Sequence, residues 1–219
     1  MKKTSIRKIF AAVAALSSFY APTLAAQTQA APLLVDSDWL ASHLKDRGMV
    51  LLHVGSGQEP TAKAEYDAGH LPGARFISLE DVSLPMKPGA LILELPPVED
   101  LRAKLSSFGI SDDSQIVVYI GKKGTFQSAT RIVFTLDYMG LRNRTSFLNG
   151  GATAWTGSGR TLTTEAPLIT SGKLTAKPQQ DLLADAALVQ SINQQPNLKL
   201  VDARTPINPA GAWQSAYPK

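Results

Sequence analysis

Apolar runs of strand length alternate with segments of helical pattern between residues 33 and 155. The apolar runs lie at 33–35, 49–54, 75–79, 115–120 and 146–148. The expected helices lie at 38–45, 61–68, 98–108 and 126–139, each closely followed by a glycine that can end a helix. Because parallel strands need long crossover connections, which are usually helices, this alternation predicts an α/β fold: an open parallel sheet flanked by helices on both faces.

The composition changes after residue 160. Residues 161–180 are rich in threonine, serine, proline and lysine and have little periodicity, which is typical of a linker between domains. Helical period resumes at 181–192, and 198–201 is apolar enough for a strand. We therefore expect one complete domain over 31–160, and over 181–219 the poorly ordered, truncated start of a second unit, since one helix and one strand cannot bury a core.

The first residues have the order of an export signal. A basic start, Met1–Lys8, precedes an apolar run, Ile9–Leu16, and small residues at Thr23 and Ala25 suit cleavage after Ala25. The apolar run is much shorter than the ~20 residues that a membrane-spanning helix needs. The pattern predicts a signal peptide over 1–25 and an exported, periplasmic protein without a membrane span once the signal is removed.

The net charge of +4 belongs to that signal. Lys2, Lys3, Arg7 and Lys8 supply four positive charges, and the rest of the chain has 18 basic and 18 acidic residues. A neutral remainder offers no single-sign field that would attract a polyanion. We therefore expect no nucleic-acid partner.

The chain contains no cysteine, which excludes a disulfide framework, a thiolate nucleophile and a cysteine-ligated metal centre. The three histidines, His43, His53 and His70, are too far apart for a short metal motif. No Gly-x-Ser-x-Gly turn is present, which disfavours a serine hydrolase. We expect neither a metal nor another cofactor.

Two segments combine glycine with turn-forming or aromatic residues. In Tyr66–Ala74, Gly69 can end a helix and Pro72 with the following glycine forces a turn into the next strand. His70 is more easily explained as a residue that holds this turn than as an acid–base catalyst. In Phe147–Trp155, a strand ends in a glycine pair, and the short helix after it carries an aromatic side chain that can pack on the sheet.

A third segment, the turn formed by Gly121, Lys122, Lys123, Gly124 and Thr125, joins the clearest strand to the longest helix. Open α/β sheets bind ligands at the carboxyl ends of their strands, and successive backbone N–H groups before a helix favour an anion. The turn is therefore the candidate anion-binding loop. The alternative is a solvated connection with two exposed lysines.

Together, segments 66–74 and 147–155 and the loop between them resemble the rhodanese (sulfurtransferase) family. The first segment looks like that family's first signature, the second like its second signature, and the resemblance covers about 35–155. It implies an exported tandem-domain thiosulfate or 3-mercaptopyruvate sulfurtransferase, cut off early in its second domain. The expected small-molecule partner is thus a sulfur-containing anion such as thiosulfate; the sequence does not specify an oligomeric state.

The resemblance also implies where this chain departs from the family. The cysteine that carries sulfane sulfur in the family aligns with Lys122, and an amine cannot form a persulfide. His53 starts the triplet that replaces the family's Asp-Val-Arg, whereas Arg204 matches the arginine that lines the catalytic pocket of a second domain. The leading hypothesis is a sulfurtransferase whose non-catalytic N-terminal domain is this chain. The alternative is a non-catalytic module that binds a small anion or a protein partner.

Overall fold

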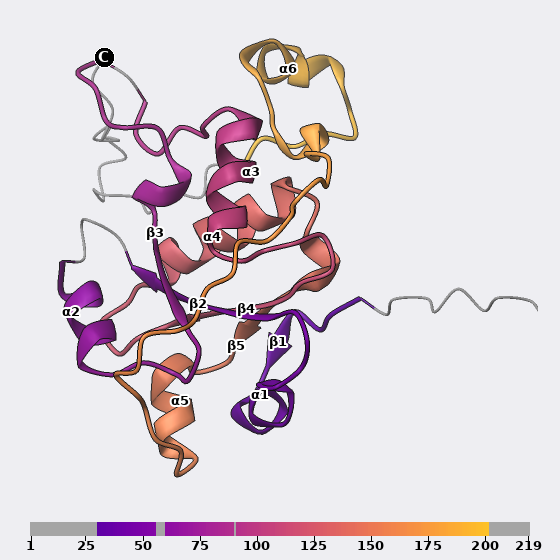
Figure 1. Ribbon diagram of the computed structural model, residues 1–219. Coiled ribbons are helices and arrows are strands. Elements are labelled where there is room, and N and C mark those ends of the chain that lie inside the picture. The colour runs from indigo at the N-terminus through magenta and orange to yellow at the C-terminus, as the bar shows by residue number, and fades with distance from the viewer. Residues whose placement is uncertain (1–29, 56–59, 90, 202–219) are drawn as a thin grey trace, which may run out of the picture.

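A five-stranded parallel sheet lies between two layers of helices in the computed structural model, which describes residues 30–55, 60–89 and 91–201 (Figure 1). The strands are β1 Leu34–Val35, β2 Met49–Gly55, β3 Arg75–Ser78, β4 Gln115–Ile120 and β5 Thr145–Leu148. Their order across the sheet is β1-β5-β4-β2-β3, and every neighbouring pair is parallel. The predicted fold class is confirmed.

Helices connect the strands and cover both faces of the sheet. The α-helices are α1 Ser37–His43, α2 Pro60–Ala68, α3 Val98–Ser107, α4 Phe126–Tyr138, α5 Gly151–Gly157 and α6 Ala186–Ser191. Short 3-10 turns occur at Glu80–Val82, Arg142–Arg144, Gln180–Leu182 and Ile192–Gln194. In Figure 1, α3 and α4 lie on one side of the sheet, whereas α1, α2 and α5 lie on the other.

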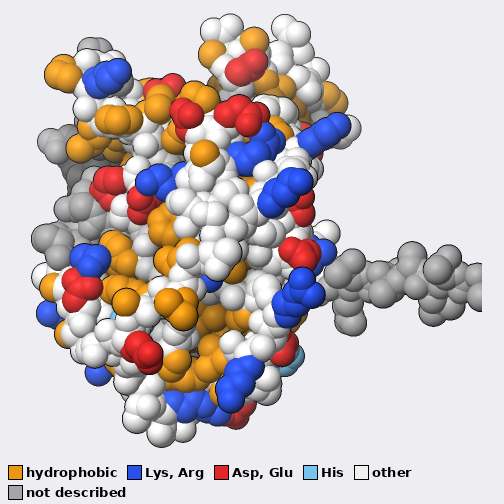
Figure 2. All heavy atoms as spheres, viewed as in Figure 1, with side chains coloured by type: hydrophobic (Ala, Val, Ile, Leu, Met, Phe, Trp, Pro, Cys, Tyr) orange, Lys and Arg blue, Asp and Glu red, His pale blue; other side chains and the backbone are white. Residues whose placement is uncertain are grey.

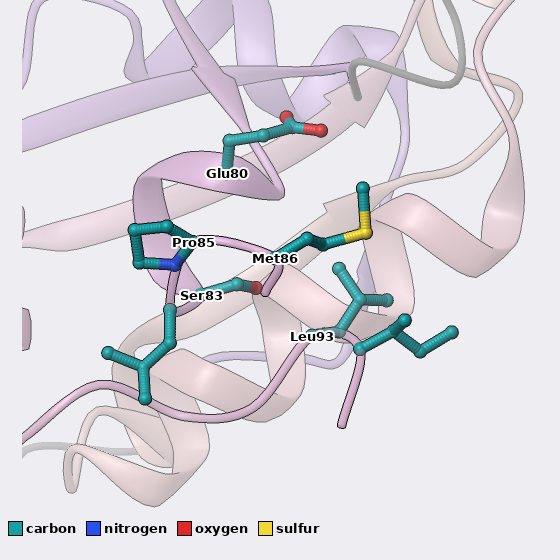
Figure 3. A pocket seen from close by; sticks show the side chains of 7 residues that line it. Glu80, Ser83, Pro85, Met86 and Leu93 are labelled. Atoms are coloured by element: carbon teal, nitrogen blue, oxygen red, sulfur yellow. The ribbon is translucent and has the colours of Figure 1, made fainter. Parts of the chain in front are cut away.

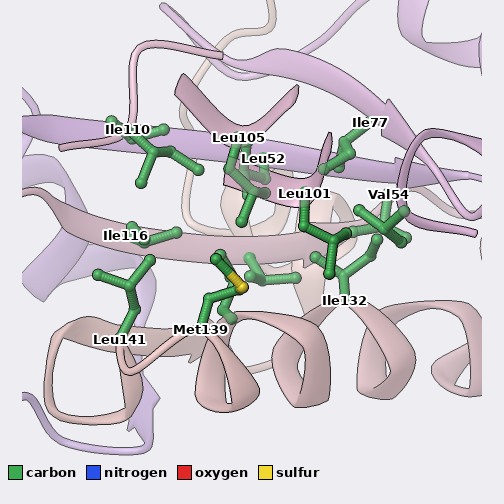
Figure 4. Close-up of a cluster of buried hydrophobic side chains, with 14 of the residues drawn as sticks. Leu52, Val54, Ile77, Leu101, Leu105, Ile110, Ile116, Ile132, Met139 and Leu141 are labelled. Carbon is green, nitrogen blue, oxygen red and sulfur yellow. The ribbon is translucent and has the colours of Figure 1, made fainter. Parts of the chain in front are cut away.

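The neighbouring strands β2 and β4 are buried along most of their length because both of their faces are covered by helices. Alternate side chains of β2, Leu52 and Val54, pack with α3 and α4 in the larger core (Figure 4). Leu51, which precedes Leu52, points to the opposite face, where it joins Leu40 of α1 and Trp155 of α5. Each such side chain stabilises the fold by about 1.5–3 kcal/mol when it is fully buried. Strand alternation thus divides the apolar residues between two cores.

The loop that follows β3 encloses an apolar cavity of about 460 Å³ (Figure 3). The cavity is lined by Glu80, Ser83, Leu84, Pro85, Met86, Ile92 and Leu93. Arg131 of α4 holds the loop, since its guanidinium donates to the carbonyl oxygen of Leu93 at 2.8 Å. This cavity shares no lining residue with the hollow beside the candidate anion-binding loop described below.

Residues 161–180, expected to form a linker, lie against the sheet domain as a strap. Leu174 is buried in the larger core. The Asp112 carboxylate accepts backbone N–H bonds from Thr175 at 2.7 Å and Ala176 at 2.9 Å. Burial disfavours the charged carboxylate, but these bonds and the charge of Arg102 hold the pKa of Asp112 below its usual range. The strap is therefore attached through both apolar burial and hydrogen bonds.

Replacing Asp112 with alanine is expected to loosen this strap. Three hydrogen bonds to the carboxylate are lost at a solvent-exposed position, two from backbone N–H groups and one from the Thr175 hydroxyl, so the free energy of local opening should fall by about 1–2 kcal/mol. Limited proteolysis should then cut within 161–180 about ten times faster than in the wild type. Asp113→Ala is the control, because Asp113 contacts Arg144 through its backbone carbonyl. Equal cleavage rates in both variants would show that Asp112 does not hold the strap.

Residues 181–201 differ from the sequence prediction. Within the helix predicted at 181–192, α-helix is confined to α6, with a 3-10 turn on each side, and the strand predicted at 198–201 is wrong. The apolar side chains of this part are exposed: Leu182, Leu183, Leu188, Val189, Leu198, Leu200 and Val201. A strand requires a paired neighbour, and residues 198–201 have none in the described part of the chain.

Candidate functional site

The candidate loop, Gly121–Thr125, lies at the carboxyl end of β4 and leads directly into α4. Its first and fourth residues close a tight turn, in which the Gly124 N–H donates to the carbonyl oxygen of Gly121 at 3.3 Å. Thr125 caps α4 by accepting the Ser128 N–H. The five residues that the sequence singled out therefore form one compact loop between strand and helix.

The backbone amides of this loop already hold a carboxylate, that of Glu65. The Lys122 N–H donates to one of its oxygens, Oε1, at 2.6 Å, and the Lys123 N–H donates to the other, Oε2, at 3.0 Å. Glu65 lies on α2, which follows β2, and β2 is the sheet neighbour of β4. Strand order thus brings α2 next to the loop, and the Glu65 side chain reaches both N–H groups.

Gly121 leaves the space that Glu65 occupies. A Cβ atom at this position would lie 2.6 Å from Oε2 and 2.7 Å from the carboxyl carbon of Glu65. Any side chain larger than hydrogen would therefore displace the carboxylate or the loop. Glycine at this position therefore lets the Glu65 carboxylate approach the loop closely.

A hollow of about 450 Å³ adjoins the pair formed by Glu65 and the loop. It is lined by Thr61, Ala64, Glu65, Ala68, Gly69, Lys122, Lys123 and Leu162. The walls are mostly small or apolar, and the charged groups are one carboxylate and two exposed lysines. A small anion could reach the loop from this side, but the amides of Lys122 and Lys123 are bonded to Glu65.

Beneath the loop, a histidine and a tyrosine are buried together on the same face of the sheet. The Tyr119 hydroxyl accepts the Leu71 N–H at 3.2 Å, so its own proton can be donated to Nδ1 of His53, also at 3.2 Å. Burial lowers the pKa of His53 to about 4, with a smaller lowering from His70 and an opposing effect of the Glu65 charge. His53 is thus a neutral core residue at the position where the resemblance expects the family's aspartate.

The two glycine-containing segments have structural roles. His70 is buried, with Nδ1 2.8 Å from the Tyr66 carbonyl oxygen and Nε2 3.1 Å from that of Glu165, so it ties α2 to the strap. Trp155 is buried in the core that contains Leu51 and donates its Nε1–H to the carbonyl oxygen of Thr161 at 3.0 Å. These contacts hold α2, α5 and residues 161–165 together, which agrees with the structural interpretation of both segments.

Sequence reasoning placed the loop correctly between β4 and α4 but missed Glu65. A signal was available, since an acidic residue lies within the helix after β2, yet nothing in the sequence orders β2 beside β4. Lys122, the residue at the expected cysteine position, is exposed at the start of the loop. Arg204 and the predicted signal peptide over 1–25 lie outside the described residues.

The charge distribution, the potential metal ligands and the lengths of the helices indicate no further functional site in the part of the chain that the structure describes. Basic and acidic side chains are interspersed on the face in Figure 2, as a neutral remainder of the chain predicts. Among the residues that the structure describes, no three His, Asp or Glu side chains gather where they could hold a metal ion. The helices in the same ranges are all too short or too polar to cross a membrane.

Comparison with known proteins places this loop and sheet in a family. The model of the rhodanese-like domain matches residues 36–158. A "probable 3-mercaptopyruvate sulfurtransferase" from Pseudomonas aeruginosa is 34% identical over 175 residues, which cover 78% of this chain and 61% of the relative. A thiosulfate sulfurtransferase from Azotobacter vinelandii is 29% identical, covering 80% of this chain and 60% of the relative. The chain thus spans about three-fifths of the length of these curated relatives.

The fold agrees with these sequence matches. SseA from Escherichia coli, whose crystal structure is described in terms of the "Rhodanese" fold of 3-mercaptopyruvate sulfotransferases, superposes with a TM-score of 0.67 at 26% identity. The superposition covers 80% of this chain and 66% of that one. The family model alone accounts for more than half of the sequence. This chain belongs to the rhodanese family.

Proposed function

We propose that this chain is the non-catalytic N-terminal part of a tandem rhodanese sulfurtransferase. The complete enzyme would transfer sulfane sulfur from thiosulfate or 3-mercaptopyruvate to a thiophilic acceptor. The observation that carries the proposal is Lys122, which stands in the loop where the family has its cysteine, in a chain without any thiol. Relatives named for both donors, and longer than this chain, support the same assignment.

The chemistry explains why the loop cannot act by itself. In sulfur transfer from thiosulfate, a thiolate attacks the outer sulfur, a new S–S bond forms, and sulfite leaves with the electron pair of the broken bond. Cyanide can then take the terminal sulfur as thiocyanate, which regenerates the thiolate. Lys122 offers an amine, and an amine does not form the persulfide on which both steps depend.

The arrangement of the chain that goes with this proposal has four parts. They are a signal peptide over 1–25 for export to the periplasm, a rhodanese domain over 31–160, a connecting segment over 161–180 and the start of a second rhodanese unit over 181–219. The exposed apolar side chains after residue 181 support the last part, since they resemble core positions without a partner. In that second unit, Arg204 would line the catalytic pocket.

The purified 219-residue protein is expected to form thiocyanate from thiosulfate and cyanide no faster than the uncatalysed reaction. Lys122→Ala is expected to leave this background rate unchanged, since no nucleophile is removed. The rate of thiocyanate formation, measured colorimetrically, checks both expectations. Turnover above background that disappears in Lys122→Ala would show that the loop is catalytic and would overturn the proposal.

The reading frame after the codon for Lys219 tests the other half of the proposal. A second Gly-His-x-Pro-Gly segment, followed by a Cys-Arg-x-Gly loop, is expected about 100 residues downstream, as one further domain requires. A frame that continues without any cysteine would favour the alternative, a non-catalytic binding module.

A further inference from the structure

We propose that Gly121–Thr125 is a preformed oxyanion site that the protein keeps closed with its own Glu65 carboxylate. The ligand class is a small oxyanion such as sulfate or thiosulfate. Glu65 acts as an internal ligand that must be removed before such an ion can bind. The inference concerns binding alone, so it stands or falls independently of sulfur transfer by a longer protein.

The first argument is the geometry of the bonds. Each oxygen of Glu65 accepts one backbone N–H, from Lys122 at 2.6 Å and from Lys123 at 3.0 Å. Two adjacent N–H groups therefore point at two oxygens of one anionic group. A tetrahedral sulfur oxyanion presents pairs of oxygens in the same way, so it can replace the carboxylate without a change in the loop.

The second argument is the space around the pair. Gly121 has no Cβ at a point that would lie 2.6 Å from Oε2, so the loop itself leaves room for an anionic group. The hollow of about 450 Å³ borders the same carboxylate and is open to a small ion. Without the Glu65 side chain, this hollow and the two N–H groups would form one continuous space.

The third argument is charge. With Glu65 present, its carboxylate offsets one of the two lysines that line the hollow. Without it, two cationic side chains and two N–H donors without a protein acceptor would face the same space, and both features favour an anion. Lys122 and Lys123 are solvent-exposed, so they contribute attraction rather than a fixed contact.

The wild-type protein should not bind free anions here, because Glu65 competes from within the chain. A carboxylate that the fold already holds against the two N–H groups acts at an effective concentration far above the millimolar value of a flexible tether, and it loses little further freedom on binding. An external ion held by two or three charge-assisted bonds reaches only roughly millimolar affinity. The internal ligand therefore wins at ordinary anion concentrations.

The experiment compares the wild type with Glu65→Ala and with Asp67→Ala. Asp67 is the matched control, since it is an exposed acid on the same helix that pairs with Lys63. Each protein is titrated with sodium sulfate and with thiosulfate to about 50 mM, well above the millimolar dissociation constant expected. Sodium chloride keeps the ionic strength constant, and backbone amide NMR shifts are followed.

Glu65→Ala is expected to show saturable shifts at 121–125 with a millimolar midpoint, whereas the wild type and Asp67→Ala show none. Glu65→Gln should bind at least about tenfold more weakly than Glu65→Ala, because its amide still fills the space. Saturable binding by the wild type would mean that the site is open. A folded Glu65→Ala without saturable shifts would mean that the contact only joins α2 to the loop. Either result overturns the proposal.

Thermal unfolding keeps the test decisive if Glu65→Ala is too unstable for NMR. Sulfate should then raise the melting temperature of Glu65→Ala by several degrees relative to chloride at equal ionic strength, since a ligand stabilises only the folded state. The same salt should not distinguish the wild type from Asp67→Ala. The absence of a sulfate-specific rise in both Glu65 variants would also overturn the proposal.

Discussion

Gly151→Ala is expected to destabilise the domain by about 3–4 kcal/mol, which combines the cost of a left-handed backbone with that of overpacking. Gly151 begins α5 at φ +54°, a conformation that residues with a Cβ rarely adopt. A Cβ there would also overlap the backbone carbonyl oxygen of Ile120, which cannot rotate away as a side chain could. The urea midpoint of unfolding, followed by tryptophan fluorescence, measures the change.

The control for this substitution lies in the same helix. Gly157→Ala adds the same methyl group at the other end of α5, where nothing lies within 4 Å of the new Cβ. It should change stability by less than about 1 kcal/mol, with the higher helix propensity of alanine in its favour. Comparable losses in the two variants would mean that the contact with Ile120 is not the cause.

The domain is also expected to lose stability steeply in mild acid because of His53. In the unfolded chain this histidine takes up a proton near its ordinary pKa of 6.5, whereas burial lowers its pKa to about 4 in the folded protein. Between these values the unfolded state binds more protons, so each pH unit below 6.5 costs about 1.4 kcal/mol. The contribution is complete above pH 6.5, and about 3 kcal/mol of it is lost by pH 4.

Urea unfolding at several pH values between 7.5 and 4.5 checks this expectation. His53→Gln removes the titrating ring, so the difference in unfolding free energy between wild type and variant should shrink as the pH falls. His43→Gln, at the partly exposed histidine that stacks on Trp39, should keep the wild-type pH profile. Parallel profiles for wild type and His53→Gln would mean that another group causes the acid sensitivity.

The elements of the sheet domain could be predicted because each has a strong local signal. The strand predicted at 115–120 coincides with β4, since a central parallel strand is apolar on both faces and reads as one continuous run. The helix predicted at 126–139 ends one residue earlier, at Tyr138, before Gly140 adopts φ +81°. Local pattern and glycine placement therefore carry most of the fold.

What could not be predicted depends on contacts between distant segments. Glu65 reaches Lys122 only because β2 pairs with β4. The local sequence pattern of a strand does not indicate which strands are its neighbours in the sheet. Likewise, the polar composition of 161–180 indicates a linker, and the anchoring carboxylate of Asp112 is more than 60 residues away. The strand expected at 198–201 failed for the opposite reason, because an apolar run needs a partner to become a strand.

The strap limits how far the following chain can move. A flexible segment of about 20 residues would let its far end wander over roughly 25 Å. Here the Gln179 N–H donates to the Tyr138 carbonyl oxygen at 2.7 Å, and the Gln180 amide donates to the Tyr138 hydroxyl at 3.2 Å. The chain thus leaves the end of α4 from a fixed point. The residues after Gln180 are therefore tethered close to the end of α4. The volume in which they can reach a docking position is small and lies near that helix.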